Sequence, residues 1–586
     1  MTYQAPVDDI VFALKTAGGL DEFLAAGQFD GLDEETVRAI IEEAGNFGAG
    51  VLAPLNWSGD RAGSKLKGGT VETPAGFREA YKAFADGGWS ALPCPTEYGG
   101  QGLPEIVAMA VCEIWNAANL SFGLCPLLTQ GAIDAISVGG SDALKAAYLP
   151  NMISGKWTGT MNLTEPHAGS DLSVLTTKAA RHQDGTYRIS GTKIFITFGD
   201  HEMTENIIHL VLARLPDAPP GTRGISLFLV PKFLVNADGT LGARNDVVCA
   251  GLEHKLGIMA SPTCVMQFGE KGGAAGYLVG EENRGLATMF VMMNAARLAV
   301  GVQGVAIAGR ATQRAVAFAK ERRQSRAGDN PSSPIIAHPD VRRMLLTMQS
   351  QTQAARMICM ATAHEMDLAH HAATATEREA AGQRAALLTP VAKGYSTDIG
   401  VEVASLGIQV HGGMGFVEET GAAQHWRDSR ILPIYEGTNG IQAIDLVTRK
   451  LALGGGAVVK SHIGWLAGIA QQASASNRPE LGKTGPRLKD AVAALDEATT
   501  WMLAALLSHP QAALAGATPY ARLFGLTTGA AFLTKGALAE PDGGSAHVGL
   551  ARFFAENILP GAQGLAASVT DGSDAVLAAP IERMSA

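Results

Sequence analysis

The fold of this chain is decided by four short segments: TYRISGTKIFIT (residues 186–197), IIHLVLARL (207–215), GISLFLVPKFLV (224–235) and SPTCVMQFG (261–269). Each is rich in β-branched and aromatic residues and is bounded by Gly, Pro, Asp or Asn, which is typical of β-strands. Because no helical pattern lies between them, they predict a mostly antiparallel sheet, folded as a barrel or a sandwich. We therefore place a middle β domain at residues 156–285.

Helical periodicity dominates the chain before this β segment. In residues 73–88, TPAGFREAYKAFADGG, Thr73 is the expected N-cap of a helix with one apolar stripe. A second helix is expected to begin after Asp33 as its N-cap and to end near Gly48. We assign residues 1–155 to an N-terminal helical domain.

Helical periodicity returns after the β segment. It runs for roughly 40 residues through ERRQS and then over three further stretches: 339–371, 384–411 and 437–452. These stretches predict a helical bundle over 286–452. Three consecutive glycines mark a linker at 453–457, and Ala- and Leu-rich helical runs predict an appended helical domain at 457–586. The predicted fold class is α+β.

Composition limits the function. The chain has 586 residues, 47% of them hydrophobic and 17% charged, with a formal net charge of −10. A large buried core is available, and more than one packed unit is expected at this length. An acidic chain has no overall electrostatic attraction to nucleic acid or anionic lipid, so neither is an expected partner.

The cysteines, the N-terminal residues and the apolar stretches indicate in which cellular compartment the protein is expected. Six cysteines lie far apart without a CxxC pair, so neither a disulfide framework nor a metal site is expected. The first residues carry acids where a signal peptide needs bases. The most apolar stretch, 288–309, is interrupted by Asn294, Arg297 and Gln303, which a membrane-spanning helix rarely accepts. We expect a cytoplasmic protein with no membrane span.

One glycine-containing segment of the β domain combines hydroxyl groups with an aromatic ring. Thr164, Ser170 and Thr197 stand on expected turns or strand ends, where they can bond a polar ring or a phosphate. Phe195, two residues before Thr197 on a strand, projects the same way and can pack beside an aromatic cofactor. The alternative is an ordinary β-turn capped by Thr164 and Asp171.

Two further segments carry charged residues in unusual places. Arg297 interrupts an apolar helix face, so its burial would require an acidic or phosphate partner. Arg322 closes the same helix, where a cation favours the helix dipole and needs no further function. Glu436 stands between Tyr435 and Gly437 just before helical periodicity resumes, and it can serve either as a catalytic acid or base or merely as an N-terminal acid of that helix.

Five motifs together make the chain recognisable as a family member. TEPHAGSDL, GTKIFIT, ERRQS, QVHGGMGF and IYEGTNGIQ follow one another in this order and resemble the signatures of the acyl-CoA dehydrogenase family. The resemblance covers about residues 30 to 452. The opening YQAPVDDIVFAL, the segment FLVNADGTLGARNDVV and the extra C-terminal helices resemble more closely the subgroup that acts on 3-(methylthio)propanoyl-CoA in dimethylsulfoniopropionate catabolism.

The resemblance implies a mechanism. An acyl-CoA thioester would be oxidised to the 2,3-enoyl form, with Glu436 as the base for the α proton and FAD N5 as the hydride acceptor. Some family members carry the base one residue before the arginine equivalent to Arg297, where this chain has Ala296. The substrate-binding residues implied are Ser170, Arg297, Tyr435, Glu436 and Gly437, and the backbone N–H of Glu436 would polarise the thioester carbonyl. The FAD-binding residues implied are Met161, Leu163, Thr164, Ser170, Phe195, Thr197, Arg322, Gln409, Gly413 and Thr438.

The resemblance also implies partners. Arg322, Gln409 and Gly413 match residues that reach the FAD of a neighbouring subunit, so a homodimer or a dimer-based oligomer is expected. An electron-transferring flavoprotein would take the electrons. The alternatives are a short- or medium-chain fatty acyl-CoA dehydrogenase, an acyl-CoA oxidase, and a DNA-binding relative that also carries added C-terminal helices. The C-terminal segment has nearly equal numbers of acidic and basic residues, which does not favour DNA binding.

Overall fold

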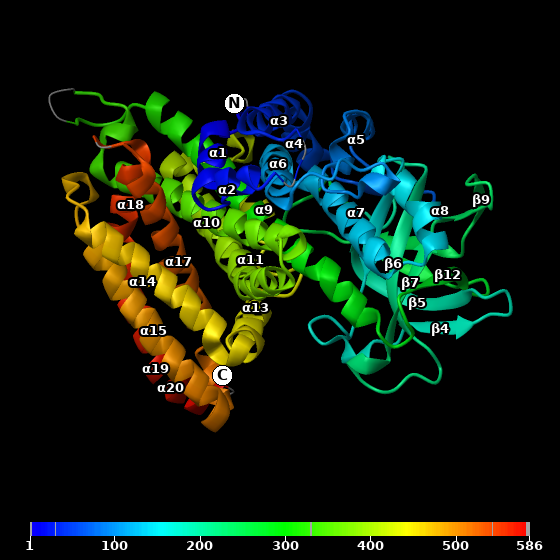
Figure 1. The fold of residues 1–586 in the computed structure, drawn as a ribbon. Helices are drawn as coiled ribbons and strands as arrows, with labels where there is room; N and C mark the ends of the chain where they lie inside the picture. Colours follow the sequence, from blue (N-terminus) through cyan, green and yellow to red (C-terminus); the bar gives the residue numbers. More distant parts are fainter. Residues whose placement is uncertain (1–2, 28, 30, 328–330, 542, 582–586) are drawn as a thin grey trace.

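The computed structural model describes residues 3–581 except 28, 30, 328–330 and 542. Helices, a β domain and further helices follow one another along the chain, which confirms the α+β class (Figure 1). The β domain lies at one end of the molecule, the last helices lie at the other, and the longest helices lie between them.

The N-terminal part is helical, with one small β-hairpin. Asp33 caps the third helix by accepting from the Thr36 N–H, as predicted, but the helix continues past Gly48 through a π-helical turn. Thr73 is not an N-cap, because its N–H and hydroxyl donate to the Glu202 carboxylate. The elements are α1 (Val7–Thr16), α2 (Leu20–Ala25), α3 (Glu34–Phe47), α4 (Ala53–Ala62), β1 (Lys65–Lys67), β2 (Thr70–Glu72), α5 (Phe77–Asp86), α6 (Glu105–Ala118), α7 (Leu120–Gly139) and α8 (Asp142–Ile153).

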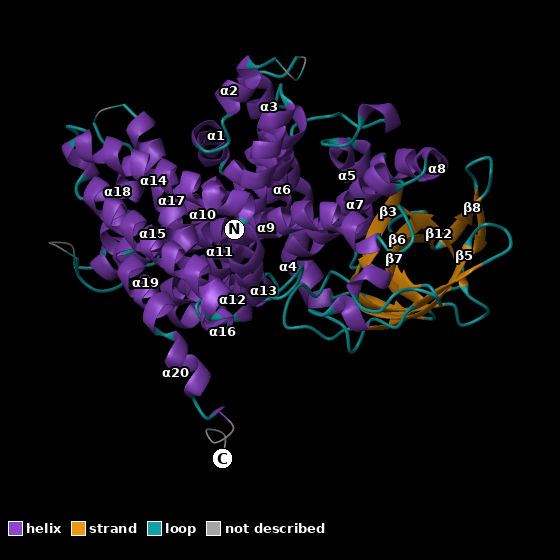
Figure 2. Ribbon diagram, turned by 60° about the horizontal axis from the view of Figure 1, so that its bottom comes forward, coloured by secondary structure: helices purple, strands orange, loops and turns teal. Residues whose placement is uncertain are grey.

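The β domain is a barrel. Its strands are β3 (Trp157–Asn162), β4 (Lys178–Arg181), β5 (Tyr187–Thr197), β6 (Asn206–Arg214), β7 (Ile225–Pro231), β8 (Phe233–Val235), β9 (Leu241–Arg244), β10 (Val247–Leu252), β11 (Thr263–Phe268) and β12 (Ala274–Val279). The main sheet has the order β10-β11-β5-β12-β7-β6-β3. Because β4 pairs with both β5 and β6, the strands β5, β12, β7, β6 and β4 close a ring (Figure 2). Pairing is antiparallel as predicted, except where β6 runs parallel to β3 and β4.

The helical bundle after the barrel carries the longest helices. Its elements are α9 (Gly285–Glu321), α10 (Pro339–His371), α11 (Ala375–His411), α12 (Ala422–Ser429) and α13 (Asn439–Asp445). The third of them begins nine residues earlier than the periodicity indicated, because Thr374 and Glu377 form a capping box there. Close contacts of Gly301 with Ala392 and of Gly304 with Ser396 bring α9 and α11 together.

The appended helices begin at the three glycines, all of which have positive φ. They are α14 (Ala457–Ala475), α15 (Thr484–Ser508), α16 (Pro510–Ala515), α17 (Ala517–Ala539), α18 (Ala546–Asn557), α19 (Ala562–Asp571) and α20 (Ser573–Ala578). Within α17, Gly525 and Gly529 lie so near α11 and α10 that an added Cβ would meet Tyr395 at 2.6 Å and Ala354 at 2.9 Å. One hydrophobic core therefore runs without a break from the bundle into the appended helices.

Within the described part of the chain, three helices, α7, α9 and α15, have the length and composition that a membrane span needs. Length and composition alone thus do not exclude the stretch around Arg297, contrary to the sequence argument. The most apolar windows of α7, α9 and α15 are 61%, 75% and 44% buried inside the protein, so much of their apolar surface is used in packing.

Candidate active site

Glu436 lies on a strained turn between α12 and α13. Its φ of 55° and the φ of 83° at Gly437 place both residues in the left-handed region, which a glutamate rarely adopts. The Gln442 side-chain amide holds the turn by donating to the carbonyl oxygens of Glu436 (3.2 Å) and Gly437 (3.3 Å). A strained backbone persists where neighbours fix it, and such sites concentrate at functional centres.

The start of α13 shows which residue caps the helix that follows Glu436. Thr438 is the N-cap of this helix, and its hydroxyl accepts from the Ile441 N–H (3.3 Å). The Glu436 carboxylate, two residues earlier, makes no hydrogen bond with any described residue. It therefore does not cap the helix, whereas the hydroxyl of Thr438, for which a cofactor contact is predicted, forms the N-cap.

Two cations face Glu436. Burial raises the pKa of its carboxyl above the ordinary value, while Arg297 from α9 and Lys393 from α11 lower it. Arg297 is 4% exposed and has the acidic partner that its burial requires, since its Nη1 lies 3.5 Å from Asp445 Oδ2. The net direction is the one expected for a base that works near neutral pH.

This pKa gives the first prediction. A carboxyl group can accept a proton only when it is ionised, so the role predicted for Glu436 implies that activity is lost as the pH falls through its raised pKa. The acidic limb of kcat/KM should therefore lie above about 4.3, the ordinary value for glutamate. The measurement is a pH–rate profile of the purified enzyme, and a profile without any group titrating above the ordinary glutamate range contradicts the prediction.

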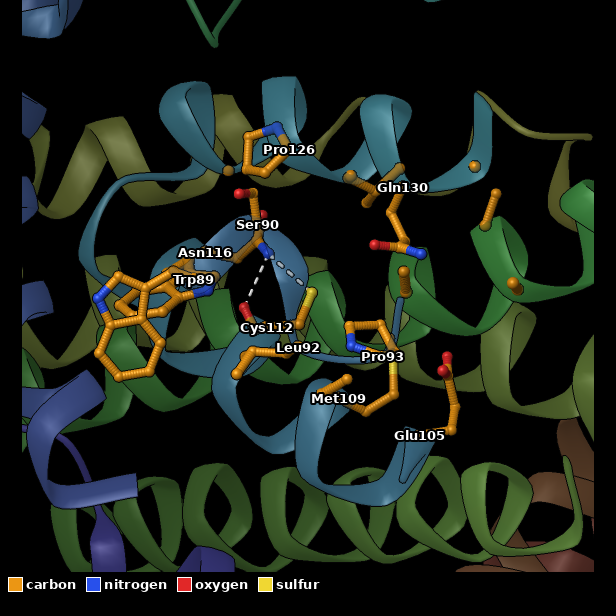
Figure 3. A pocket seen from close by; sticks show the side chains of 18 of the residues that line it. Trp89, Ser90, Leu92, Pro93, Glu105, Met109, Cys112, Asn116, Pro126 and Gln130 are labelled. Atoms are coloured by element: carbon orange, nitrogen blue, oxygen red, sulfur yellow. Dashed lines mark hydrogen bonds between the residues drawn. The ribbon is translucent and has the colours of Figure 1, made fainter. Parts of the chain in front are cut away.

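A cavity of about 90 Å³ opens between α6, α7 and α9 (Figure 3). Apolar side chains such as Leu92, Met109 and Leu127 form most of its wall, and α9 contributes only alanines, Ala296 among them. The position that carries the base in some family members therefore lies at the cavity wall without a functional group. Ser90, Glu105, Asn116, Gln130 and Asp134 add polar groups to the lining.

A chain of hydrogen bonds joins this cavity to the turn. The Tyr435 hydroxyl donates to Gln303 Oε1, and Gln303 Nε2 donates to Asn116 Oδ1 (3.0 Å). Asn116 in turn donates to the carbonyl oxygen of Cys112 (2.8 Å), and both residues line the cavity. The residue next to Glu436 is thus tied to the cavity wall. Sequence reasoning missed this link, although Gln303 stood out as a polar residue in an apolar stretch.

The predicted flavin residues of the barrel lie on two adjoining segments. Met161 is buried at the end of β3, Leu163 and Thr164 follow it half-buried, and the Thr164 carbonyl accepts from the Ile194 N–H of β5 (2.9 Å). The fully buried Lys193 donates to the Leu163 carbonyl oxygen at 3.0 Å. These bonds fix the segment after β3 against β5.

A buried ion pair reinforces this junction. Lys193 Nζ lies 2.8 Å from Glu165, which also accepts from the N–H and hydroxyl groups of Thr176 and Thr177. Burial raises the pKa of the Glu165 carboxyl, but Lys193 and these donors outweigh it and lower the value to about 2. The carboxylate therefore stays charged and holds the strand end in place.

Phe195 lies at a β-bulge that exposes its side chain. The register of β5 against β11 shifts at this point, Phe195 has a φ of 60°, and its side chain is 57% exposed. Ile196 is buried whereas Thr197 is only half-buried, so Phe195 and Thr197 share the more open side. A strand end with an exposed ring and a nearby hydroxyl offers a surface for a flat aromatic group.

The remaining predicted cofactor residues lie elsewhere. Ser170 is on an exposed turn after β3. Arg322 follows α9, Gln409 is in the last turn of α11, and Gly413 comes just after it, all three exposed. The stacked rings of Phe318 and His411, with centroids 4.5 Å apart, bring these two helix ends together. They lie at the opposite end of α9 from its start at Gly285, which packs against β7.

The potential metal ligands and the cysteines were also located. Over residues 3–581 with the stated gaps, no group of three or more His, Cys, Asp or Glu is placed to hold a metal ion. All six cysteines are free thiols, five of them buried.

Four family models match the chain. They describe the N-terminal domain (residues 34–156), middle domain (160–270) and C-terminal domain (283–451) of acyl-CoA dehydrogenases and an acetyl-CoA dehydrogenase C-terminal-like domain (465–580). The chain belongs to the acyl-CoA dehydrogenase family, a class of FAD-dependent oxidoreductases.

The chain is similar over nearly its whole length to known enzymes and to a solved structure. The chain is 48% identical to 3-methylmercaptopropionyl-CoA dehydrogenase of Ruegeria pomeroyi, over 99% of this chain and 100% of that protein. It is 35% identical to a butyryl-CoA dehydrogenase of Syntrophomonas wolfei over 96% of each chain. The solved acyl-CoA dehydrogenase of Bacillus anthracis, complexed with FAD, has the same fold, with a TM-score of 0.75 at 20% identity over 95% of this chain and 91% of that one.

Proposed function

We propose that this chain oxidises a short acyl-CoA thioester to its 2,3-enoyl form, with Glu436 as the base that removes the α proton. The observation that carries the proposal is the strained turn at Glu436, which holds a half-buried carboxylate facing two cations. Hydrogen bonds from Tyr435 through Gln303 to Asn116 connect this turn to the wall of a largely apolar cavity. This carboxylate accepts no hydrogen bond from a described residue, so its oxygens are available to a substrate.

The backbone of the same turn supports a second role. The N–H of Glu436 makes no hydrogen bond within the described part of the chain, so it can donate to the thioester carbonyl oxygen. A donor at that oxygen stabilises the negative charge that develops when the α proton leaves. The left-handed backbone of Glu436 would thus serve both the carboxylate and the N–H.

We propose FAD as the resident cofactor. The bulge that exposes Phe195, together with Thr197 and Thr164, fits a flat ring with polar edges. When bound, FAD would accept the hydride from the β carbon, a task that protein side chains cannot perform. Met161 and Leu163 would border the ring through their backbone, and Ser170 would bond a phosphate from its exposed turn.

A second copy of the chain is part of the proposal. Arg322, Gln409 and Gly413 gather at helix ends on the surface, beside the exposed side chains of Met414 (51%) and Phe416 (89%). Large exposed apolar side chains next to a basic group suit an interface between subunits. We therefore propose a homodimer, or an oligomer built from dimers, in which these residues reach the FAD of the partner subunit.

The proposed substrate is 3-(methylthio)propanoyl-CoA. It is supported by the 48% identity to the Ruegeria pomeroyi enzyme, which extends through the C-terminal helices. The largely apolar wall of the cavity suits an uncharged acyl tail. An electron-transferring flavoprotein as acceptor and a cytoplasmic location complete the proposal.

The test is relative turnover on propanoyl-, butanoyl-, octanoyl- and 3-(methylthio)propanoyl-CoA. We expect kcat/KM for the methylthio substrate to exceed that for octanoyl-CoA at least about tenfold, the effect of a few misfitting methylenes. A preference for octanoyl-CoA would overturn the substrate, and no oxidation of any of them would overturn the reaction. Peroxide formation in place of reduction of an electron-transferring flavoprotein would identify an oxidase.

A further inference from the structure

A lysine with no exposed side chain lies under the turn that carries Glu436. Lys393 of α11 donates from Nζ to the Gly437 carbonyl oxygen (2.9 Å) and to Asn439 Oδ1 (2.8 Å). Taking an ammonium group out of water is costly, and two neutral acceptors compensate for only part of that cost. A buried lysine in this place therefore calls for a reason beyond packing.

The first reason is geometric. The Gly437 carbonyl that Lys393 holds belongs to the residue directly after Glu436, within the strained part of the turn. The second acceptor, Asn439, is the first residue of α13, and its side-chain amide donates back to α11 at the Gly394 carbonyl (3.1 Å) and Asp398 Oδ1 (2.7 Å). Lys393 and Asn439 thus fasten both ends of the short segment 437–439 to one rigid helix.

The second reason is electrostatic. The charged groups that face Lys393 are Glu436, Asp398 and Arg297, and those that face Glu436 are Arg297 and Lys393. Burial lowers the pKa of Lys393 to about 7, because the attraction of the two carboxylates does not offset the loss of water. Below neutral pH Lys393 is therefore mostly protonated, and its positive charge acts on the Glu436 carboxylate through a medium that screens it weakly.

We infer that Lys393 is a positioning residue for the proposed base. Its ammonium group fixes the Glu436–Gly437 turn through the Gly437 carbonyl and favours the ionised form of the Glu436 carboxyl. The inference rests on the proposed function, since it concerns the same carboxylate.

The decisive variant is Lys393→Met, which keeps much of the length of the side chain and removes the charge and both donors. Without the cation the pKa of Glu436 rises further, so the acidic limb of the kcat profile should move to higher pH, by about one unit if the lost attraction is near 1.4 kcal/mol. At the wild-type optimum kcat should fall about 10- to 100-fold, with a smaller change in KM. Lys460→Met, an exposed lysine on α14, is the matched control and should leave both unchanged.

Two further variants separate charge from geometry. Gln442→Leu removes the other donor to this turn without a change of charge. It should therefore lower kcat while the acidic limb of the kcat–pH profile stays at the same pH. Lys393→Arg keeps the charge and should return the limb toward the wild-type position even if kcat recovers only in part. A purely structural role for Lys393 would not move the limb in this pattern.

Lys393→Gln is the second neutral variant, in case the methionine variant does not fold, since its amide can still donate to Gly437. If Lys393→Met or Lys393→Gln folds and the acidic limb of its kcat–pH profile lies at the same pH as in the wild type, the inference is wrong. This outcome is distinct from failure of the proposed function, in which the wild-type enzyme itself would not oxidise an acyl-CoA.

Discussion

The Glu436→Gln variant is expected to lose turnover by about a thousandfold, the loss typical of removing a general base. Glutamine has the size of glutamate and no basic oxygen, so the strained backbone and the cation-lined surroundings stay as they are. The measurement is acyl-CoA-dependent bleaching of the flavin absorbance under single-turnover conditions. Unaltered flavin content and melting temperature would show that the loss is chemical.

A matched control comes from the surface of α5. Glu79 is exposed on this helix and lies outside the proposed site, so Glu79→Gln should keep wild-type turnover. If Glu436→Gln retains turnover within tenfold of the control, another group removes the α proton, and the proposed mechanism is wrong.

The largest effect on stability is expected at Glu113. Its carboxylate on α6 receives the Arg356 guanidinium of α10 at 2.7 and 2.9 Å, and both side chains are 3% exposed. Glu113→Ala leaves an unpaired buried cation, so the free energy of unfolding should fall by about 3–5 kcal/mol. Denaturant titration of the holoenzyme, read by circular dichroism, measures it.

The control for Glu113 is the double variant Glu113→Leu with Arg356→Met. Replacing both charges by apolar side chains removes the unpaired cation, so most of the lost stability should return. A double variant as unstable as Glu113→Ala would mean that packing, rather than the unpaired charge, dominates at this site.

Much of the fold was predictable because the signals are local. The β-branched segments gave strands at the expected places, and Asp33 capped its helix because its partner, Thr36, is three residues away. The prediction that Thr73 is an N-cap was wrong, because its N–H and hydroxyl donate hydrogen bonds to Glu202, which is distant in the sequence. The closure of the barrel by β4 depends on pairings between strands that no local pattern encodes.

The candidate site was predictable only in part. The acidic partner of Arg297 was predictable, because a buried guanidinium requires one, and Asp445 fills that role. Lys393 was missed because a single lysine in a helical stretch is normally a solvated side chain, and only the packing of α13 shows that it is buried. Phe195 was placed on the correct strand, but the bulge that exposes it depends on the register with β11.

The glycines of α17 have a consequence for the evolution of this architecture. Gly525 and Gly529 allow α17 to pack closely against Tyr395 and Ala354. The surfaces of α10 and α11 that face α17 are therefore as hydrophobic as a protein core. Deletion of the coding sequence for the helices that follow the three glycines would expose those hydrophobic surfaces to water and favour aggregation. A lineage could shed or acquire these helices only by changing the outer residues of both older helices as well, so the extra unit is not a detachable module.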